Sequence, residues 1–222
     1  MGHSYDKNEM YFQVQGDPHP WPHNGRTPAA ACAVLVVDMQ HDYCSPGYYI
    51  AQAGYDTKRL RAPIRPIRQV LAAARVHGLH VLYTRHGRVE ASHSPGPKTA
   101  APGEPGWQIV PELLPQAGET IIEKSTCSAF ISGELDRVLR HKPITHLALC
   151  GNTIDVCVHS TLRTAVDLGY ECLLLADGCG AVNDGLHRWA IESVKVENGI
   201  FGTVASAQSF VDGLRLAKEA QA

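Results

Sequence analysis

The sequence predicts a single α/β domain: a three-layer α/β/α sandwich with a mostly parallel central sheet. Short runs of Val, Leu and Ile without polar alternation, typical of strands buried on both faces, recur along the 222 residues. Longer segments with helical periodicity separate these runs, and no internal linker divides the chain. Alternating strands and helices favour a parallel sheet, so we expect ligands to bind beyond the carboxyl ends of the strands.

Six apolar runs are the predicted strands. They are ACAVLVVDM (31–39), HVLYTR (80–85), TIIEK (120–124), HLALCG (146–151), ECLLLAD (171–177) and, as a candidate sixth, GTVAS (202–206). Several of the predicted helices end at a glycine, which suits a helix C-terminus. These helices cover residues 63–78, 132–142, 153–169 and 183–199, with a closing helix over 206–222.

Residues 1–30 differ from the rest of the chain in composition. They are rich in Pro, His and Gly and have no apolar periodicity, which predicts an extended arm with Trp21 as its anchor. A disordered tail is the alternative. The α/β domain is therefore expected to span residues 31–222.

Charge and composition exclude several classes of partner. With a formal charge of -2 and no stripe of Lys and Arg, the chain has no footprint for nucleic acid. It has neither the apolar core of a signal peptide nor a run of about 18 apolar residues, so we expect no membrane partner and a cytoplasmic location. A small-molecule ligand fits this composition better.

The seven cysteines form no CxxC pair, which predicts reduced thiols rather than disulfides or a zinc ribbon. Cys157 differs from the others because it lies where a helix begins, with Thr153 or Asp155 as the cap. The helix N-terminus and a nearby cation both lower the pKa of a thiol. Packing in the core is the alternative interpretation for any single cysteine.

Two other chemically useful side chains are predicted at the same edge of the sheet. Asp38 closes the first strand and Lys124 closes the third. Lys124 could stabilise a thiolate at Cys157, Asp38 could accept the thiol proton, and backbone N–H groups of the first helical turn could bind an oxyanion. These parts predict acyl transfer through a thioester. A thiol redox or binding module that uses Cys157 as a sensor is the rival hypothesis.

Three blocks carry a resemblance to a known superfamily: VLVVDMQHDY, IIEKSTCSAF and CGNTIDVCVHSTLRTAVDLGYECLLLADGCGA. They resemble the signature blocks of the isochorismatase-like cysteine hydrolases, whose sheet has a Rossmann-like topology. The resemblance implies that Asp38, Lys124 and Cys157 are a catalytic triad. It also implies a cis peptide at Asn152-Thr153, and an oxyanion hole formed by the backbone N–H groups of Thr153 and Cys157.

Other blocks resemble the branch that hydrolyses linear ureides, namely biuret and triuret hydrolases, with ureidoacrylate amidohydrolase as a cousin. They are DPHPWPHNG, GYDTKRLRAPIRPI, GEPGWQIVPEL and ENGIFGTV. The chain departs from the biuret-type pattern by having Cys127 in place of a lysine and Glu197 in place of a glutamine. The first change frees space, and the second leaves a carboxylate that can only accept hydrogen bonds. Both changes favour a longer, NH-rich ureide, so the expected activity is release of ammonia from triuret rather than biuret.

Further substrate-binding candidates are Tyr43, Phe201 and Arg85, the last at the end of the second strand. Ureidoacrylate and nicotinamide-type amides are the alternative substrates. No metal and no organic cofactor are expected, because the histidine arrangement of a catalytic zinc site is absent from YTRHGRVEASHS. The resemblance implies a homo-oligomer, with a tetramer favoured.

Overall fold

The computed structural model describes residues 9–88 and 98–221 of the chain. Its centre is a six-stranded sheet in the order β5-β4-β3-β6-β7-β8, in which every neighbouring pair is parallel. The strands are β3 (Cys32–Val37), β4 (His80–His86), β5 (Thr120–Lys124), β6 (His146–Asn152), β7 (Glu171–Gly180) and β8 (Thr203–Ala205). The predicted three-layer α/β fold is confirmed, and the candidate sixth strand is present.

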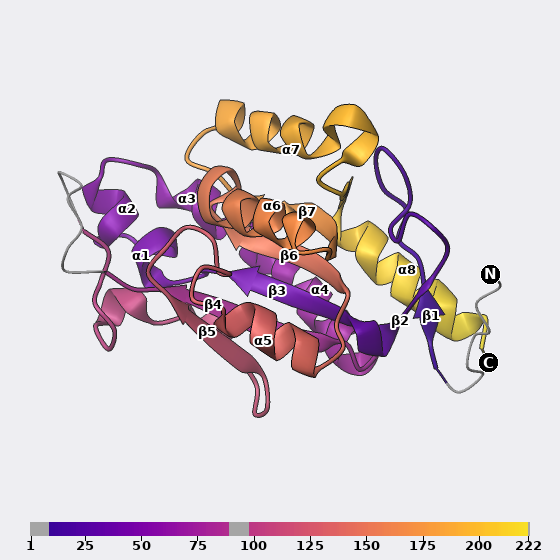
Figure 1. Cartoon of the computed structure of the whole chain (residues 1–222). Coiled ribbons are helices and arrows are strands. Elements are labelled where there is room, and N and C mark those ends of the chain that lie inside the picture. Colours follow the sequence, from indigo (N-terminus) through magenta and orange to yellow (C-terminus); the bar gives the residue numbers. More distant parts are fainter. Residues whose placement is uncertain (1–8, 89–97, 222) are drawn as a thin grey trace.

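Helices cover both faces of this sheet (Figure 1). One layer holds α4 (Ile64–Val76) and α8 (Ala207–Glu219), which pack against each other. The other layer holds α5 (Glu134–His141), α6 (His159–Asp167) and α7 (Asp184–Gly199). All six residues of β3 are buried, because both of its faces are covered. The apolar runs of the sequence are therefore strands of the core.

Several short helices lack a counterpart among the predicted elements. Between β3 and α4 lie α1 (His41–Cys44), α2 (Tyr49–Gln52) and α3 (Thr57–Arg61). Single 3₁₀ turns are η1 (Ala29–Ala31), η2 (Pro105–Trp107) and η3 (Pro111–Leu113). Segments of three to five residues are too short to show helical periodicity.

The described part of the N-terminal segment is ordered against the domain. It contains a small antiparallel pair, β1 (Tyr11–Phe12) and β2 (Thr27–Pro28). Trp21 is completely buried, and its Nε1 donates a hydrogen bond to the carbonyl of Glu171, 3.3 Å away. The segment therefore lies along the amino ends of the strands.

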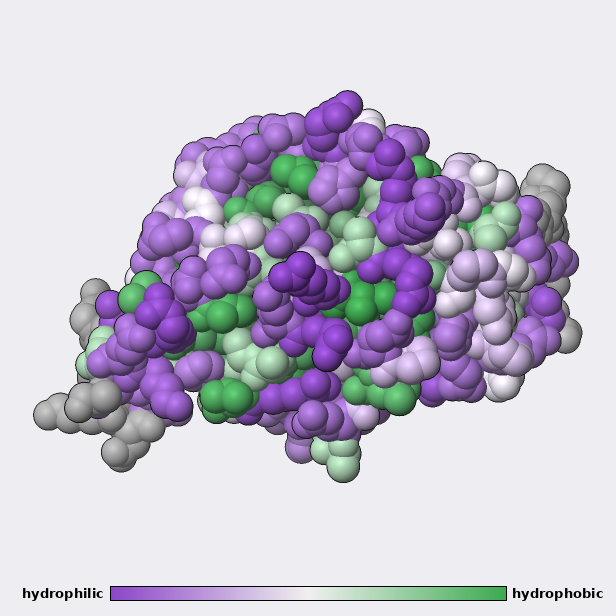
Figure 2. Space-filling view, turned by 180° about the vertical axis from the view of Figure 1, so that it is seen from behind, coloured by the Kyte–Doolittle hydropathy of each residue, from purple (hydrophilic) through white to green (hydrophobic). Residues whose placement is uncertain are grey.

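The outer surface is mixed in character. The face shown in Figure 2 is mostly hydrophilic, with apolar residues in separate patches. Among the described residues, no helix has the length and apolar composition needed to cross a membrane.

Candidate active site

The topology of the sheet brings two loops together at its centre. Strands β3 and β6 are hydrogen-bonded neighbours, although the chain continues from β3 outward to β4 and from β6 outward to β7. In open parallel sheets, ligands bind where the strand order reverses in this way, beyond the carboxyl ends. Asp38 follows β3 directly, and the segment that carries Cys157 follows β6. Both side chains therefore lie at the expected place for a ligand site.

Asp38 is held by contacts from two neighbouring strands. Its Oδ2 lies 2.6 Å from Nζ of Lys124, the last residue of β5, and both side chains are almost fully buried. The hydroxyl of Thr84, on β4, donates to Oδ1 of Asp38 and accepts the backbone N–H of Asp38 at 3.1 Å. The backbone of Asp38 has a φ of 48°, which is costly for a residue other than glycine. The carboxylate orientation is therefore fixed by an ion pair, a hydroxyl and a constrained backbone.

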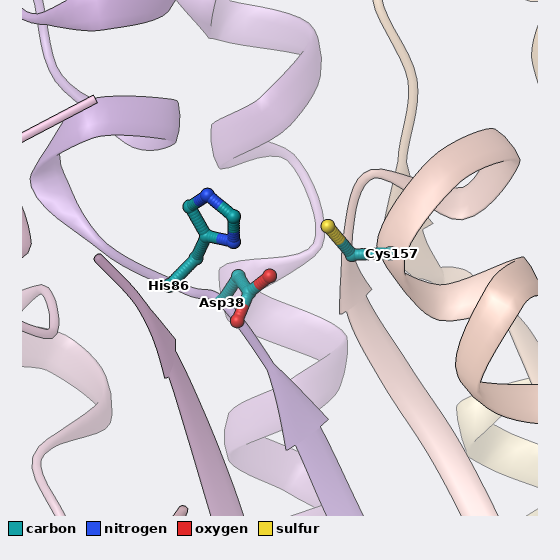
Figure 3. Close-up of side chains that lie close together, drawn as sticks. All are labelled: Asp38, His86 and Cys157. Atoms are coloured by element: carbon teal, nitrogen blue, oxygen red, sulfur yellow. The ribbon is translucent and has the colours of Figure 1, made fainter. Parts of the chain in front are cut away.

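Cys157 lies on a single π-helical turn, η4 (Ile154–Val158), which runs directly into α6. Thr153 precedes this turn, but its side chain makes no capping hydrogen bond, and the peptide bond from Asn152 to Thr153 is cis. The Cys157 sulfur points toward Asp38 and His86, and the ligating atoms of these three residues lie within 4.8 Å of one another (Figure 3). A proton acceptor therefore lies within 4.8 Å of the sulfur.

A second thiol lies beside Cys157. Cys127 lies in the bend between β5 and α5 and lines a common pocket with Cys157, and each thiol shifts the pKa of the other. The neighbouring Cys127 thiol raises the pKa of Cys157, and burial adds to the effect. The hydrogen bond from Cys157 lowers the pKa of Cys127 to about 6, against a burial effect and with help from the Lys124 charge. The two thiols therefore hold one negative charge between them readily and resist a second.

The pKa shifts of the basic groups near the sulfur indicate which of them carries a positive charge. Burial opposes the charge on Lys124, but Asp38 and Cys157 outweigh it and raise the pKa of the ammonium. Burial, and then the Lys124 charge, lower the pKa of His86, whose Nδ1 lies 3.4 Å from Nζ of Lys124. Lys124 is therefore charged beside a neutral imidazole at neutral pH.

Asp38, His86 and Cys157 have the residue types and the spacing of a three-ligand zinc site. The Lys124 ammonium, however, lies within hydrogen-bonding distance of the Asp38 carboxylate and close to the imidazole. A divalent cation bound by the same atoms would meet its repulsion. We therefore keep the metal-free mechanism as a prediction. His93, the second histidine of YTRHGRVEASHS, lies outside the described residues.

A pocket of about 530 Å³ opens above the Cys157 sulfur. Cys127 and Tyr43, both predicted to bind substrate, line it. Tyr43 packs edge-on against Tyr49, with ring centroids 6.0 Å apart. The other lining residues are Tyr49, Ile50, Tyr55, His86, Arg88, Lys98, Thr99, Ser125, Thr153, Asp155, Val156, Val182 and Leu186.

Asp155 is a pocket residue whose role the sequence did not reveal beyond a helix cap. Its Oδ1 is buried and, among the described residues, has no hydrogen-bond partner. An unpartnered buried carboxylate oxygen is costly, which favours a donor arriving with a ligand. In the sequence, the signal for Asp155 is its position two residues before Cys157.

Two predicted substrate-binding residues lie away from this pocket. Glu197 lines a separate cavity of about 440 Å³ with His19 and Glu171. Phe201 packs under the guanidinium of Arg163, 3.8 Å from the ring centroid. The reason is the direction of α7, which begins near the carboxyl ends of the strands and ends at their amino ends. The structure therefore does not bring Glu197 and Phe201 to the pocket at Cys157, and their role in substrate binding stays a prediction.

Arg85 is also engaged elsewhere. Its guanidinium forms an ion pair with Glu123 on β5 and stacks on Trp107, 3.6 Å from the ring centroid. Successive strand residues point to opposite sides, so Arg85 points away from the side on which Thr84 meets Asp38. The prediction that Arg85 binds substrate is not supported by this geometry.

The protein is a parallel α/β/α sandwich whose candidate site groups a thiol, a carboxylate and an ammonium at the strand ends. Comparison with known sequences and structures identifies its family. The isochorismatase domain model matches residues 32–209. The chain therefore belongs to the isochorismatase family.

Relatives and solved structures agree with this membership. The chain is 31% identical over 212 residues to the ureidoacrylate amidohydrolase RutB of Variovorax paradoxus (strain S110), covering 82% of this chain and 81% of that protein. A cysteine hydrolase from Pseudomonas syringae pv. phaseolicola 1448A superposes with a TM-score of 0.75 at 26% identity, covering 92% of this chain and 98% of that one. An N-carbamoylsarcosine amidase from Thermoplasma acidophilum shares the fold, with a TM-score of 0.67 at 24% identity, covering 79% and 96%.

Proposed function

We propose that the chain is a cysteine amidohydrolase that cleaves the terminal C–N bond of a small linear ureide and releases ammonia. The observation that carries this proposal is that the Cys157 sulfur, on the wall of the pocket, lies within 4.8 Å of the Asp38 carboxylate, which is itself paired to Lys124 at 2.6 Å. A thiol needs a proton acceptor and a stabilising charge to become a nucleophile, and this grouping supplies both.

In the first half of the reaction, Asp38 takes the proton of Cys157 and the sulfur attacks the terminal carbonyl carbon of the ureide. The carbonyl oxygen becomes an oxyanion, for which the backbone N–H groups of Thr153 and Cys157 are the proposed donors. When the intermediate collapses, the C–N bond breaks, Asp38 returns its proton to the leaving nitrogen, and ammonia departs. A thioester remains on Cys157.

In the second half, a water molecule attacks the thioester carbon and gives a proton to Asp38. The C–S bond breaks, the thiolate is reprotonated by Asp38, and the shortened acid leaves. Lys124 remains charged through both halves, because the negative charge moves only between Asp38, the sulfur and the oxyanion. The cycle therefore needs no group besides those of the chain and water.

For the substrate, triuret is the first candidate. Cys127 is a short side chain on the pocket wall, which leaves room beyond the first carbonyl. The carboxylate that faces the ureide N–H groups is that of Asp155, rather than that of Glu197, and its Oδ1 lacks a partner among the described residues. Asp155 can accept a hydrogen bond from an N–H of the ureide chain.

Ureidoacrylate is the second candidate, and a specific observation favours it. Arg88 and Lys98 both line the pocket, on the side that follows β4. Two cationic side chains suit the carboxylate of a ureido acid, which triuret lacks. The relatives named as ureidoacrylate amidohydrolases support the same alternative.

Parallel assays of ammonia release on triuret, biuret, ureidoacrylate and nicotinamide test these proposals. Cys157→Ser should keep the fold and lose turnover on every substrate; unchanged ammonia release from this variant would exclude the mechanism. Arg88→Gln with Lys98→Gln should raise KM for ureidoacrylate and leave KM for triuret unchanged. Asp155→Asn should raise KM for triuret, while a variant of a pocket residue without a donor or acceptor, Ile50→Val, should not. Equal rates on all four substrates would contradict the proposed specificity.

A further inference from the structure

Cys127 and Cys157 are the only two cysteines that line the pocket, within the part of the chain that the structure describes. The other five are buried in the core. Three of them, Cys32, Cys150 and Cys172, are fully or almost fully inaccessible on strands, and burial raises the pKa of each thiol. The two pocket thiols are therefore the ones that a small oxidant in solution can reach.

The two pocket thiols lie side by side and differ in exposure. They line one pocket and each shifts the pKa of the other, although they come from segments that are 30 residues apart in the sequence. Cys127 is exposed, whereas Cys157 is only 5% exposed. Cys127 also lies in a bend, outside any helix or strand, so its backbone can adjust to a change at its sulfur.

Oxidation to a disulfide requires two thiols that can reach each other and a thiolate at one of them. A thiolate is the reactive form toward peroxides, and a second thiol in contact traps the first oxidation product. Lys124 supplies the positive charge that favours the thiolate at Cys127. Asp38, whose carboxylate lies within 4.8 Å of the Cys157 sulfur, can accept the second proton.

We propose that Cys127 and Cys157 form a reversible disulfide when a hydroperoxide enters the pocket. The Cys127 thiolate attacks one peroxide oxygen, the O–O bond breaks, and the leaving alkoxide or hydroxide takes up a proton. The sulfur becomes a sulfenic acid. Cys157 then attacks that sulfur, its proton goes to Asp38, and the S–O bond breaks to release water with the same proton.

The step balances as two thiols plus one hydroperoxide giving one disulfide, one alcohol or water, and one further water. Both sulfurs are oxidised, and the peroxide oxygen is reduced. A dithiol reverses the step by thiol–disulfide exchange. Cys157 in the disulfide cannot be oxidised directly to the irreversible sulfinic and sulfonic acids. The disulfide with Cys127 therefore inactivates Cys157 reversibly and protects it from irreversible oxidation.

Oxidation of the full-length chain with hydrogen peroxide, followed by peptide mass mapping under non-reducing conditions, tests this proposal. The wild-type protein should yield a peptide pair joined through Cys127 and Cys157, lose its ammonia release, and regain it with dithiothreitol. Cys127→Ser should yield no joined peptides, should add two or three oxygen atoms to Cys157, and should stay inactive after reduction. Cys32→Ala, which removes a core thiol at the other end of β3, should behave as the wild type does.

The proposal is overturned if Cys157 of the wild-type protein gains oxygen atoms at the same rate as in Cys127→Ser and no joined peptide forms. The loss of activity rests on the proposed amidohydrolase function, but the joined peptide does not. A protein that forms the disulfide but shows no ureide turnover would therefore contradict the proposed amidohydrolase function and still support the proposed disulfide.

Discussion

Nζ of Lys124 lies 2.6 Å from Oδ2 of Asp38, and the two side chains are 1% and 0% exposed. A buried ion pair contributes little net stability, but removing one partner leaves a charge with nothing to balance it. Asp38→Asn should therefore lower the free energy of unfolding by about 3–5 kcal/mol. The same change should lower ammonia release by about 100-fold or more, because it removes the proton acceptor.

A double variant separates the two effects of this change. Asp38→Asn combined with Lys124→Met removes both charges, so urea denaturation should show much of the lost stability returning while turnover stays absent. Equal stability of the single and double variants would contradict the view that the unpaired ammonium causes the loss.

Thr84 is expected to act on catalysis through the orientation of Asp38. Its hydroxyl donates to the carboxylate and accepts the Asp38 backbone N–H at 3.1 Å. Thr84→Val keeps the shape and removes both contacts, so kcat should fall about tenfold, the size of one hydrogen bond to a charged group, with little change in KM. Thr84→Ser should restore kcat. A rise in KM with kcat unchanged would place Thr84 in substrate binding instead.

The reactivity of Cys127 should depend on pH in a way that its exposure alone does not predict. The hydrogen bond from Cys157 lowers the pKa of Cys127 to about 6, although burial opposes this effect. Because the thiolate is the reactive form, the rate of alkylation at Cys127 should rise with pH through about 6 and level off above it. Peptide mapping after iodoacetamide treatment measures the rate at each cysteine.

Cys157→Ala is the matched control for that measurement. It removes the hydrogen-bond donor, so the midpoint for Cys127 should move up toward the ordinary thiol value of 9.0. An unchanged midpoint would mean that Lys124, rather than the second thiol, determines the charge on Cys127.

Gly151 allows the close approach of β6 to β3 beside the site. Its φ is +121°, and an added Cβ would lie 2.0 Å from the carbonyl oxygen of Val37, so Gly151→Ala must move backbone as well as adopt a strained φ. Gly118→Ala is the control, because Gly118 has a φ of +89° but open space around it. Thermal unfolding should show a loss of about 1–3 kcal/mol for the control and a clearly larger loss for Gly151→Ala. Equal losses would mean that the backbone angle, and not the contact with Val37, is limiting.

The strands and the meeting of Asp38, Lys124 and Cys157 could be predicted because both follow from local patterns. Continuous apolar runs identify buried strands, and residues that end parallel strands share one edge of the sheet. The short helices α1, α2 and α3 could not, since four or five residues show no period. The catalytic roles of the three residues remain predictions.

The positions of Glu197 and Phe201 away from the pocket have a topological cause. The substrate-binding role of Glu197 is predicted from resemblance to a sequence pattern, although a helix that follows a strand and returns across the sheet must end at the opposite edge. The predicted order, in which the helix over 183–199 follows the strand over 171–177, already implies that Glu197 lies at the opposite edge of the sheet from Cys157. The role of Asp155 was hidden for another reason, because a missing hydrogen-bond partner is a property of the folded surroundings and leaves no mark on the sequence.

The N-terminal segment has a consequence for how copies of this chain meet. Asp17 exchanges two backbone hydrogen bonds of 2.9 Å with Val204 of β8, the strand at one edge of the sheet. An uncovered edge strand offers its N–H and C=O groups to any other extended chain, which is a route to aggregation. By pairing with part of that edge, the segment around Asp17 prevents further strands from adding to the sheet. Deletions that remove this segment would therefore leave a chain that aggregates.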